Sequence, residues 1–358
     1  MVVRVYLKQA WNLMKQNPLF STLYIVGTGI SIVMTMVIAI VYYVRLAPVY
    51  PETNRMRTLV VKSAKMTNDE STHSSNISYA MLKDWFYSLE SAEVSTGVSG
   101  TSYARVTNDK EEIPTYARYT DENFFRVFPL VFLEGKPFTE ADRRSGIHNV
   151  VLTDSYAQQL FGTTKGVVGK NFLMDYTNVK VVGVVKSGSF LTPDSYAQVY
   201  LPYSCRDGYD DEGSHWALGG YRVYILMKES KSVTDVQDEV LELVRKFNVS
   251  DMGDGWKLDL VGQPELYWHS TFRLWSNVAV DWGRVIWMFV GIFMVLLFVP
   301  AFNLSGMISA RMERQLPDLG IRKAFGASRR RLLVQIIWEN LLLTGLGTLL
   351  GLVIAWIV

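Results

Sequence analysis

The sequence predicts an α+β membrane protein, in which transmembrane helices carry one large mixed α/β domain on the outer side of the membrane. The 358 residues are 49% apolar and their mean hydropathy is +0.11, which is high for a water-soluble protein but low for one made only of membrane helices. Long apolar runs lie near both ends of the chain, and a long polar stretch separates them. Basic and acidic residues nearly balance, 36 against 34, so no overall positive field indicates a nucleic-acid partner.

The first apolar run, residues 19–46, predicts a retained transmembrane helix. Residues 24–44 contain no charge and no proline, and at ~1.5 Å per residue they span roughly 31 Å, the thickness of a hydrocarbon core. The alternative is a secretory signal peptide, whose apolar region is only about 7–15 residues long. This run is longer and ends in Tyr42, Tyr43 and Arg45, which favours an anchor.

Residues 283–308 predict a second transmembrane helix, which is uncharged after Arg284. Pro300 and Asn303 lie inside it, and in a membrane both need neighbouring helices to satisfy the polar groups they leave open. Two interpretations remain open: a kinked helix that packs against its neighbours, and a hinge.

Residues 332–358 predict a third transmembrane helix. Gly347 and Gly351 are spaced as GxxxG, which lets another helix approach closely. Glu339 is the one carboxylate in this run. It is either a functional group inside the membrane or, two turns from the basic end, a carboxylate at the membrane surface.

Residues 309–331 are predicted to be cytoplasmic, because basic residues near a membrane span concentrate on that side. The basic residues are Arg311, Arg314, Arg322, Lys323, Arg329, Arg330 and Arg331, and the acidic residues are Glu313 and Asp318. The N-terminus is then cytoplasmic and residues 47–282 lie outside. Residues 1–18 predict an amphipathic helix on the inner membrane surface.

Residues 47–282 alternate between patterns typical of strands and of helices. Near the start, strands at 58–61 and 94–98 flank a helix that Ser78 opens, and near the end strands at 221–227 and 256–261 flank a helix that Thr234 caps. These two βαβ-like units predict a split domain with an inserted β-rich subdomain at residues 120–217. The predicted elements inside the insertion are strands at 149–153 and 179–185 and a helix at 155–161.

The sequence contains no recognisable catalytic or metal-binding constellation. Residues 164–171 only superficially resemble a phosphate loop, because Thr164 and Asn171 stand where that loop needs Gly and Ser or Thr. The four histidines have no ligand spacing, and the lone Cys205 predicts an inert side chain. We therefore expect a protein that is not an enzyme, without catalytic residues and without a metal.

Residues 319–328, LGIRKAFGAS, resemble the EIGIRKALGA segment of ABC transporter permeases of the MacB/FtsX family, and they stand in the expected place between the second and third spans. Asn303 and Arg311 also match common positions, whereas Asp318 stands where the family usually has glutamate. Further segments resemble the family's periplasmic core in the same order: residues 123–125, 133–138, 160–162, 169–170, 181–185 and 199–202.

The resemblance implies a multi-pass permease of the bacterial inner membrane with its large domain in the periplasm and four spans, of which the fourth is missing here. It also implies coupling to a separate ABC ATPase that holds ATP and Mg²⁺, so no cofactor is expected on this chain. The implied ATPase-coupling residues are Glu313, Asp318, Gly320, Ile321, Arg322, Lys323, Phe325 and Gly326. The predicted membrane-packing residues are Asn303, Gly347 and Gly351, of which the two glycines rest on their GxxxG spacing.

The expected partners are this ATPase, a second permease copy or a sister permease, membrane lipids, and a periplasmic adaptor with an outer-membrane protein. Two functions remain open. One is export of peptides, drugs, lipids or lipoproteins, including efflux of antimicrobial peptides. The alternative is an FtsX-like regulator that transmits ATPase motion to a periplasmic cell-wall hydrolase without transport. The size of the 47–282 domain favours export. The basic residues of 309–331 have their own alternative, which is to fix topology and bind anionic headgroups.

Overall fold

The computed structural model describes residues 11, 15, 18–100, 102–108, 111–206, 208–210, 216–250, 255–325 and 328–357. The chain divides into two compact units. The helical unit comprises Met1–Tyr43 and Trp282–Val358, and the α/β unit comprises Val44–Asp281. Most of the predicted amphipathic segment 1–18 lies outside the described residues.

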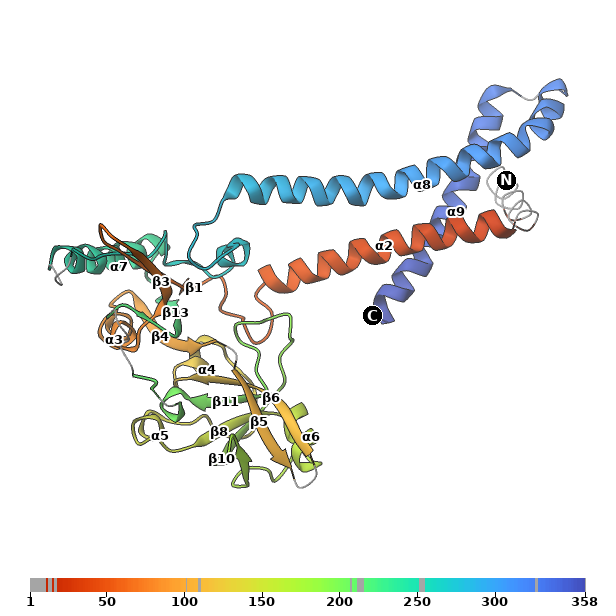
Figure 1. Cartoon of the computed structure of the whole chain (residues 1–358). Helices are drawn as coiled ribbons and strands as arrows, with labels where there is room; N and C mark the ends of the chain where they lie inside the picture. The colour runs from red at the N-terminus through yellow and green to blue at the C-terminus, as the bar shows by residue number, and fades with distance from the viewer. Residues whose placement is uncertain are drawn as a thin grey trace. The chain divides into compact units, whose positions relative to one another are not determined.

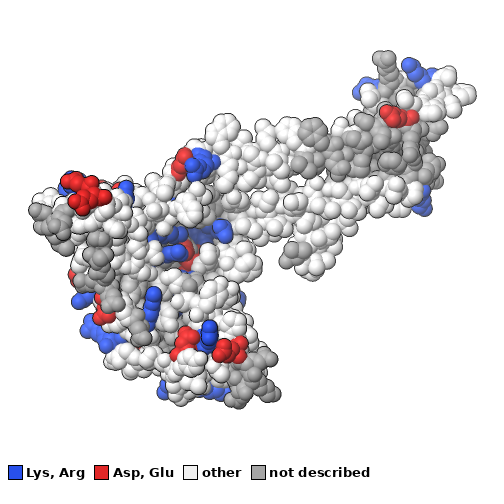
Figure 2. Space-filling view, in the orientation of Figure 1, with Lys and Arg blue, Asp and Glu red and all other residues white. Residues whose placement is uncertain are grey.

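The described part of the helical unit contains three long helices (Figure 1): α2 (Pro18–Leu46), α8 (Trp282–Ala324) and α9 (Arg329–Ile357). By length and composition, α2 and α9 each hold a stretch able to cross a membrane, Ser21–Leu46 and Ile336–Ile357. α8 holds a shorter apolar stretch, Trp282–Leu296. Figure 2 shows an uncharged described surface along the middle of these helices, with charged groups at the end where α8 and α9 meet.

The structure places no element boundary at residue 308, where the sequence predicted that a span ends and a cytoplasmic segment begins. α8 is a single helix of 43 residues that continues through Pro300. At 1.5 Å per residue it is about 65 Å long, roughly twice the thickness of a hydrocarbon core. One helix therefore contains the predicted second span and most of the predicted 309–331 segment, because that segment is rich in good helix formers.

The first sheet of the α/β unit has eight strands in the order β14-β2-β3-β13-β1-β15, with β4 paired to β13 and β12 to β3. The strands are β1 (Thr58–Val61), β2 (Ala64–Thr67), β3 (Thr72–Ile77), β4 (Ala92–Ser99), β12 (Leu218–Gly219), β13 (Tyr221–Met227), β14 (Lys257–Asp259) and β15 (Glu265–Leu266).

Four of these strands form two interleaved βαβ units. β1 and β4 both pair antiparallel with β13, so they run parallel to each other, and α3 (Tyr79–Asp84) lies in the connection between them. In the same way β13 and β15 both pair antiparallel with β1, and α7 (Val233–Val249) lies in their connection. The order β15-β1-β13-β4 is the ferredoxin-like, split βαβ arrangement.

The second sheet has seven strands in the order β7-β10-β8-β11-β6-β5-β9, and an additional pairing of β9 with β10 closes six of them into a ring. The strands are β5 (Ser102–Asn108), β6 (Glu111–Thr120), β7 (Phe132–Gly135), β8 (Asn149–Thr153), β9 (Asn171–Met174), β10 (Thr177–Val185) and β11 (Val199–Pro202). We call this block the ring subdomain.

The ring subdomain starts earlier in the chain than the insertion predicted at 120–217, and it also ends earlier. Its first strand starts at Ser102 and its last strand ends at Pro202. β6 was missed because three of the four buried positions near its end are polar, Thr115, Arg118 and Thr120 beside Ala117, and they give no apolar alternation.

Strand β1 is buried on both faces, and its alternation divides its side chains between two cores. Leu59 and Val61 pack in the core that includes residues of α3 and α7. Val60 packs in a second core with α4 (Phe124–Val127). A third core, which includes Leu152, belongs to the ring subdomain. Both faces of β1 must therefore be apolar, as its sequence TLVV predicts.

Short elements complete the unit: α5 (Glu140–Arg144), α6 (Asp154–Phe161) and the 3₁₀ turns η1 (Phe86–Ser88), η2 (Tyr203–Cys205) and η3 (His269–Phe272). Ser78 caps α3, as predicted, by accepting a hydrogen bond from the Met81 amide. The predicted cap of α7 at Thr234 is wrong. Ser232 caps that helix, because Asp235 stands at the position that completes a capping box.

Candidate functional site

The predicted coupling residues lie at the C-terminal end of α8. Ile321 and Phe325 are four residues apart, and their side chains are 57% and 89% exposed, so two apolar groups lie one helical turn apart. A larger group of the predicted coupling residues is exposed: Glu313, Gly320, Ile321, Lys323 and Phe325. Asp318 and Arg322 lie within the helix, but their side chains are not described, and Gly326 lies outside the described residues. The exposed set forms a charged and apolar surface suited to a protein partner.

Two of the three predicted packing residues lie against α2. A Cβ added at Gly347 would lie 2.7 Å from Thr28 Cβ and 2.9 Å from the Ile25 carbonyl oxygen. A Cβ added at Gly351 would lie 2.8 Å from the Gly29 carbonyl oxygen. The GxxxG pair thus faces a glycine on the opposite helix, and only hydrogen fits in the space between them.

Further contacts join the same two helices. The Tyr24 hydroxyl lies 3.0 Å from the Thr344 hydroxyl, and Tyr24 packs with Leu343 in a small buried cluster. The third predicted packing residue, Asn303, lies in α8, and its side chain is not described. The α2–α9 contact is therefore built from both close backbone approach and a hydrogen bond across the helices.

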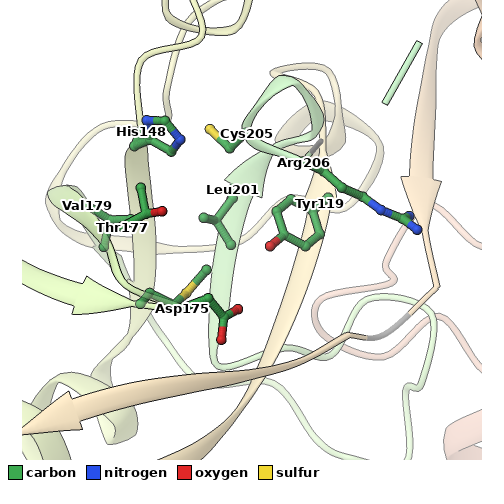
Figure 3. A pocket seen from close by; sticks show the side chains of 9 residues that line it. Tyr119, His148, Asp175, Thr177, Val179, Leu201, Cys205 and Arg206 are labelled. Carbon is green, nitrogen blue, oxygen red and sulfur yellow. The ribbon is translucent and has the colours of Figure 1, made fainter. Parts of the chain in front are cut away.

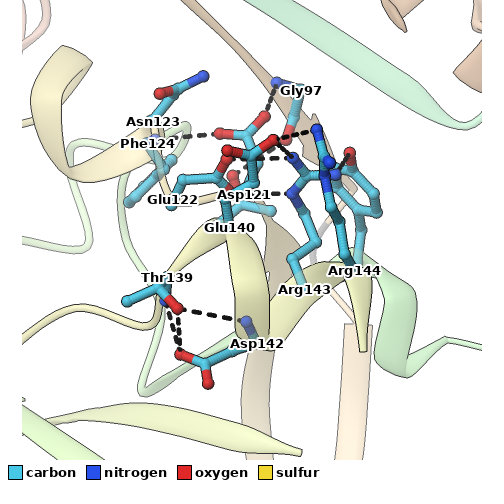
Figure 4. A network of polar contacts seen from close by, with 12 residues as sticks. Gly97, Asp121, Glu122, Asn123, Phe124, Thr139, Glu140, Asp142, Arg143 and Arg144 are labelled. Carbon is cyan, nitrogen blue, oxygen red and sulfur yellow. Dashed lines mark hydrogen bonds and ion pairs between the residues drawn. The ribbon is translucent and has the colours of Figure 1, made fainter. Parts of the chain in front are cut away.

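A buried carboxylate, which the sequence analysis did not single out, joins the ring subdomain to the first sheet. Asp121 directly follows β6 and is fully buried. On β4, the Thr96 hydroxyl donates to one of its oxygens at 2.6 Å and the Gly97 amide to the other at 2.9 Å. Tyr87 of η1 donates at 2.5 Å, and the Phe124 amide at 3.1 Å (Figure 4). We call these five residues the junction.

Two opposing effects act on the junction carboxylate. Burial raises the pKa of Asp121 from its usual 3.8 to about 6, although the hydrogen bonds from Thr96, Tyr87 and the Gly97 amide act in the opposite direction. Removing any one donor leaves a buried polar group short of a partner, at a cost of about 1–3 kcal/mol. The junction is therefore both a structural link and a titratable one.

A second polar link lies beside the junction and is drawn in Figure 4. Arg143 of α5 holds Glu122 with two hydrogen bonds, at 2.7 and 3.0 Å, and donates to the Tyr203 hydroxyl at 2.8 Å. The Tyr203 ring packs edge-on against Tyr79 of α3, with centroids 5.5 Å apart. Two-point recognition of a carboxylate fixes orientation as well as distance, so Glu122 holds Arg143 in place within the ring subdomain. The contact of Tyr203 with Tyr79 then joins this group to α3.

The ring subdomain also contains a pocket of about 340 Å³ (Figure 3), whose lining includes Tyr119, His148, Asp175 and Cys205. Burial raises the pKa of the Cys205 thiol to about 12, so the unreactive thiol predominates at neutral pH. Among the described residues, no group of three or more His, Cys, Asp or Glu could hold a metal ion. The pocket therefore offers no activated nucleophile at Cys205.

Two family models match the chain. Residues 20–243 match the model of the MacB-like periplasmic core domain, and residues 277–358 match the model of the FtsX-like permease C-terminal region. The chain belongs to the MacB/FtsX family of ABC transporter permeases. The resemblance found in the sequence is thus confirmed, and this family is one of inner-membrane permeases with a periplasmic domain.

Several curated relatives align with this permease. A pyoverdine export ATP-binding/permease protein of Pseudomonas entomophila is 25% identical over 64% of this chain and 34% of its own length. A macrolide export ATP-binding/permease protein of Bdellovibrio bacteriovorus is 23% identical over 61% of this chain and 32% of its own. An uncharacterised ABC transporter permease of Bacillus subtilis is 22% identical over 64% of this chain and 54% of its own. The permease thus spans about a third of the length of the first two.

Among solved structures, the periplasmic region of MacB from Actinobacillus actinomycetemcomitans matches 55% of the permease and 88% of that chain. Its sequence identity is 16% and the TM-score is 0.39.

The glycine contact generates the first prediction. In Gly347→Leu a side chain must enter the space that Thr28 and the Ile25 carbonyl already fill, so we expect a loss of about 1–3 kcal/mol of stability from overpacking. Thermal unfolding of the purified full chain in detergent measures this loss. Gly345→Leu is the matched control, since a Cβ there meets nothing within 4 Å. Equal melting temperatures for the two variants would contradict the assigned contact.

The junction generates a pH prediction. Because the pKa of Asp121 is raised to about 6, its contribution to stability is largest below about pH 4 and is lost as the pH rises through 6. Asp121→Asn removes this titration and sets an amide donor against the Gly97 or Phe124 amide. We expect the variant to be less stable at pH 4 by about 1–3 kcal/mol, with a difference from wild type that shrinks toward pH 7.

The measurement is denaturant unfolding of both proteins at several pH values. Asp69→Asn, on an exposed carboxylate, is the control and should track the wild type at every pH. A difference that instead grows as the pH rises would mean that the four donors hold Asp121 ionised, against the assigned direction.

Proposed function

We propose that this chain is the permease subunit of an ABC transporter, and that a separate ATPase docks on residues 309–331 and moves the α/β unit through α8. The observation that carries this proposal is the continuity of α8. The helix begins at Trp282, directly after the α/β unit, and ends at Ala324 inside the 309–331 segment. A continuous helix carries a displacement along its axis, because its backbone hydrogen bonds resist compression.

The composition of the first candidate span supports transmission of motion in preference to a polar channel. Across Ser21–Leu46 the sole charged residue is Arg45, at the end of the span. Transporters that conduct a hydrophilic substrate through their helices usually place ionisable or broken-helix sites near the middle of the membrane. The substrate is then expected to be handled by the α/β unit.

We further propose that the process is export of peptides, drugs, lipids or lipoproteins, with a second permease copy or sister permease completing the complex. The names of two relatives, which describe pyoverdine and macrolide export, support an export function. Stimulation of ATP hydrolysis by a candidate substrate in the purified complex tests it. A regulator of a cell-wall hydrolase would instead respond to the hydrolase and to no exported compound.

Docking is tested by charge reversal. We expect Arg322→Glu with Lys323→Glu to lower copurification of the ATPase by about tenfold or more, because interfacial charge reversal replaces attraction with repulsion costing several kcal/mol. The measurement is the ratio of ATPase to permease after affinity purification of the permease from membranes.

The matched control is Arg330→Glu, an exposed cation at the start of α9. This variant reverses one charge of the 309–331 segment, against two in the test variant, at a position that is not among the predicted coupling residues. If all variants lose the ATPase equally, the basic segment acts only through its total charge, and the docking assignment fails.

Topology is tested by labelling. In a Cys205→Ala background, Ser328→Cys should react with a membrane-impermeant maleimide only after the inner face of the membrane is opened, because residues 309–331 carry the positive-inside signal. A cysteine at Tyr176, which is 86% exposed in the ring subdomain, should react in spheroplasts without opening. The reverse pattern would place the ATPase-docking segment on the wrong side of the membrane.

A further inference from the structure

A basic pocket of about 240 Å³ lies at the end of the α/β unit that continues into α2. Its lining includes the cations Arg45, Arg55, Lys62 and Arg222, together with Asp194 and Tyr267. Since a water molecule occupies about 30 Å³ of liquid, the pocket has room for several waters or for one small anionic group. None of these residues was singled out in the sequence for binding, and the proposed ATPase coupling does not use them.

The pocket and its surroundings hold more cations than carboxylates. Lys62 Nζ lies 3.2 Å and Arg222 Nη1 3.1 Å from the two oxygens of Asp194. Buried Glu52 pairs with Arg55. Although burial alone would raise it, Lys62, Arg222 and Arg118 hold the pKa of Asp194 well below its usual value. The lining holds four cations and one carboxylate, Asp194, and Glu52 outside the lining neutralises Arg55, which leaves an excess of two positive charges.

Two of the four cations lie over one aromatic ring. The Arg55 guanidinium lies 5.0 Å and the Lys62 ammonium 6.0 Å from the centre of the Tyr267 ring. The Arg55 side chain is only 3% exposed, and its Nε has no hydrogen-bond partner among the described residues. The nearby Glu265 does not neutralise them, because Arg273 binds it at 2.7 Å. Like charges gathered in this way repel unless an anion joins them.

We propose that this pocket binds a phosphate-bearing anion, either the headgroup of an anionic phospholipid or a free phosphate compound. Arginine and lysine donors converging on one space are the groups that proteins use to bind phosphate. The excess of two positive charges matches a singly or doubly charged phosphate. Asp194 fixes the positions of Lys62 and Arg222, and their remaining donors are available for the ligand.

The position of Arg45 favours the headgroup as the source. Arg45 lies next to the last residue of α2 and of the candidate span Ser21–Leu46. The Thr271 hydroxyl donates to its carbonyl at 3.5 Å, which ties this helix end to η3. A pocket that includes the end of a membrane span is within reach of lipid headgroups, which basic pockets of this kind recognise.

The test measures melting curves of the full chain in a neutral detergent, with tryptophan fluorescence as the signal. The probes are dihexanoyl phosphatidylglycerol and glycerol 3-phosphate. Sodium chloride at the same ionic strength is the control for electrostatic screening of the charges. We expect the lipid to raise the melting temperature at concentrations where the salt does not. We expect Arg45→Gln and Lys62→Gln to weaken the apparent affinity by about tenfold or more, the usual effect of losing one charged hydrogen bond.

The control is Lys180→Gln, which removes an exposed cation from β10 of the ring subdomain and should bind as the wild type does. Without a probe, Arg45→Gln should melt at the wild-type temperature or above it, since it relieves repulsion. A rise in melting temperature with both phosphate probes assigns the site to free phosphates. A rise with the lipid alone assigns it to headgroups. No shift, or equal shifts in all variants, overturns the proposal. Because no ATPase is present, failure here is distinct from failure of the docking proposal.

Discussion

The two chain segments that connect the α/β unit to the membrane helices meet in one pair of strands. β1 follows α2 in the chain, and β15 is the last strand before α8. The two pair antiparallel at Leu59↔Leu266 and Val60↔Glu265, and the Tyr267 amide donates to the Thr58 carbonyl at 2.8 Å. Under the proposed mechanism, a force from α8 would enter the sheet at β15, beside the first strand after α2. Both faces of β1 are buried, so the pair cannot shift without disturbing two cores.

The ring subdomain is attached to the first sheet by directional hydrogen bonds as well as by apolar contacts. An apolar contact alone tolerates sliding, since hydrophobic burial has no preferred direction. Asp121 accepts hydrogen bonds from two elements of the first sheet's layer, β4 and η1, and hydrogen bonds weaken steeply when they bend. Arg143 also donates to the Tyr203 hydroxyl, and the Tyr203 ring packs against Tyr79 of α3. The ring subdomain should therefore follow the sheet as one body.

Periodic patterns in the sequence predicted elements that bury apolar side chains, namely β1, β4, β13 and the helices of the first sheet. They failed where the buried side chains are polar, as at Thr115 and Arg118 of β6. The junction could not be predicted either, because the partners of Asp121 on β4 and η1 are brought to it only by the fold. Ser232, and not the predicted Thr234, caps α7 because Asp235 three residues later completes a capping box with it. The coupling residues of 309–331 were predicted from the resemblance to the MacB/FtsX family. The charge of this segment alone does not identify them, because membrane topology explains that charge equally well.

One side chain connects the strand pair to the chain that leads into α8. Arg273 donates through Nε to Glu265 at 2.7 Å, through Nη2 to the Val261 carbonyl at 3.2 Å and through Nη1 to the Val278 carbonyl at 2.6 Å. Breaking a buried ion pair costs about 3–5 kcal/mol, more than the few backbone hydrogen bonds of β15. Residues 274–279 are exposed. Without the hydrogen bonds of Arg273, this segment would change shape when α8 moves and the movement would not reach β15. Under the proposed mechanism, Arg273 would pass a displacement of α8 on to β15, because it binds both the strand pair and the chain that leads into the helix.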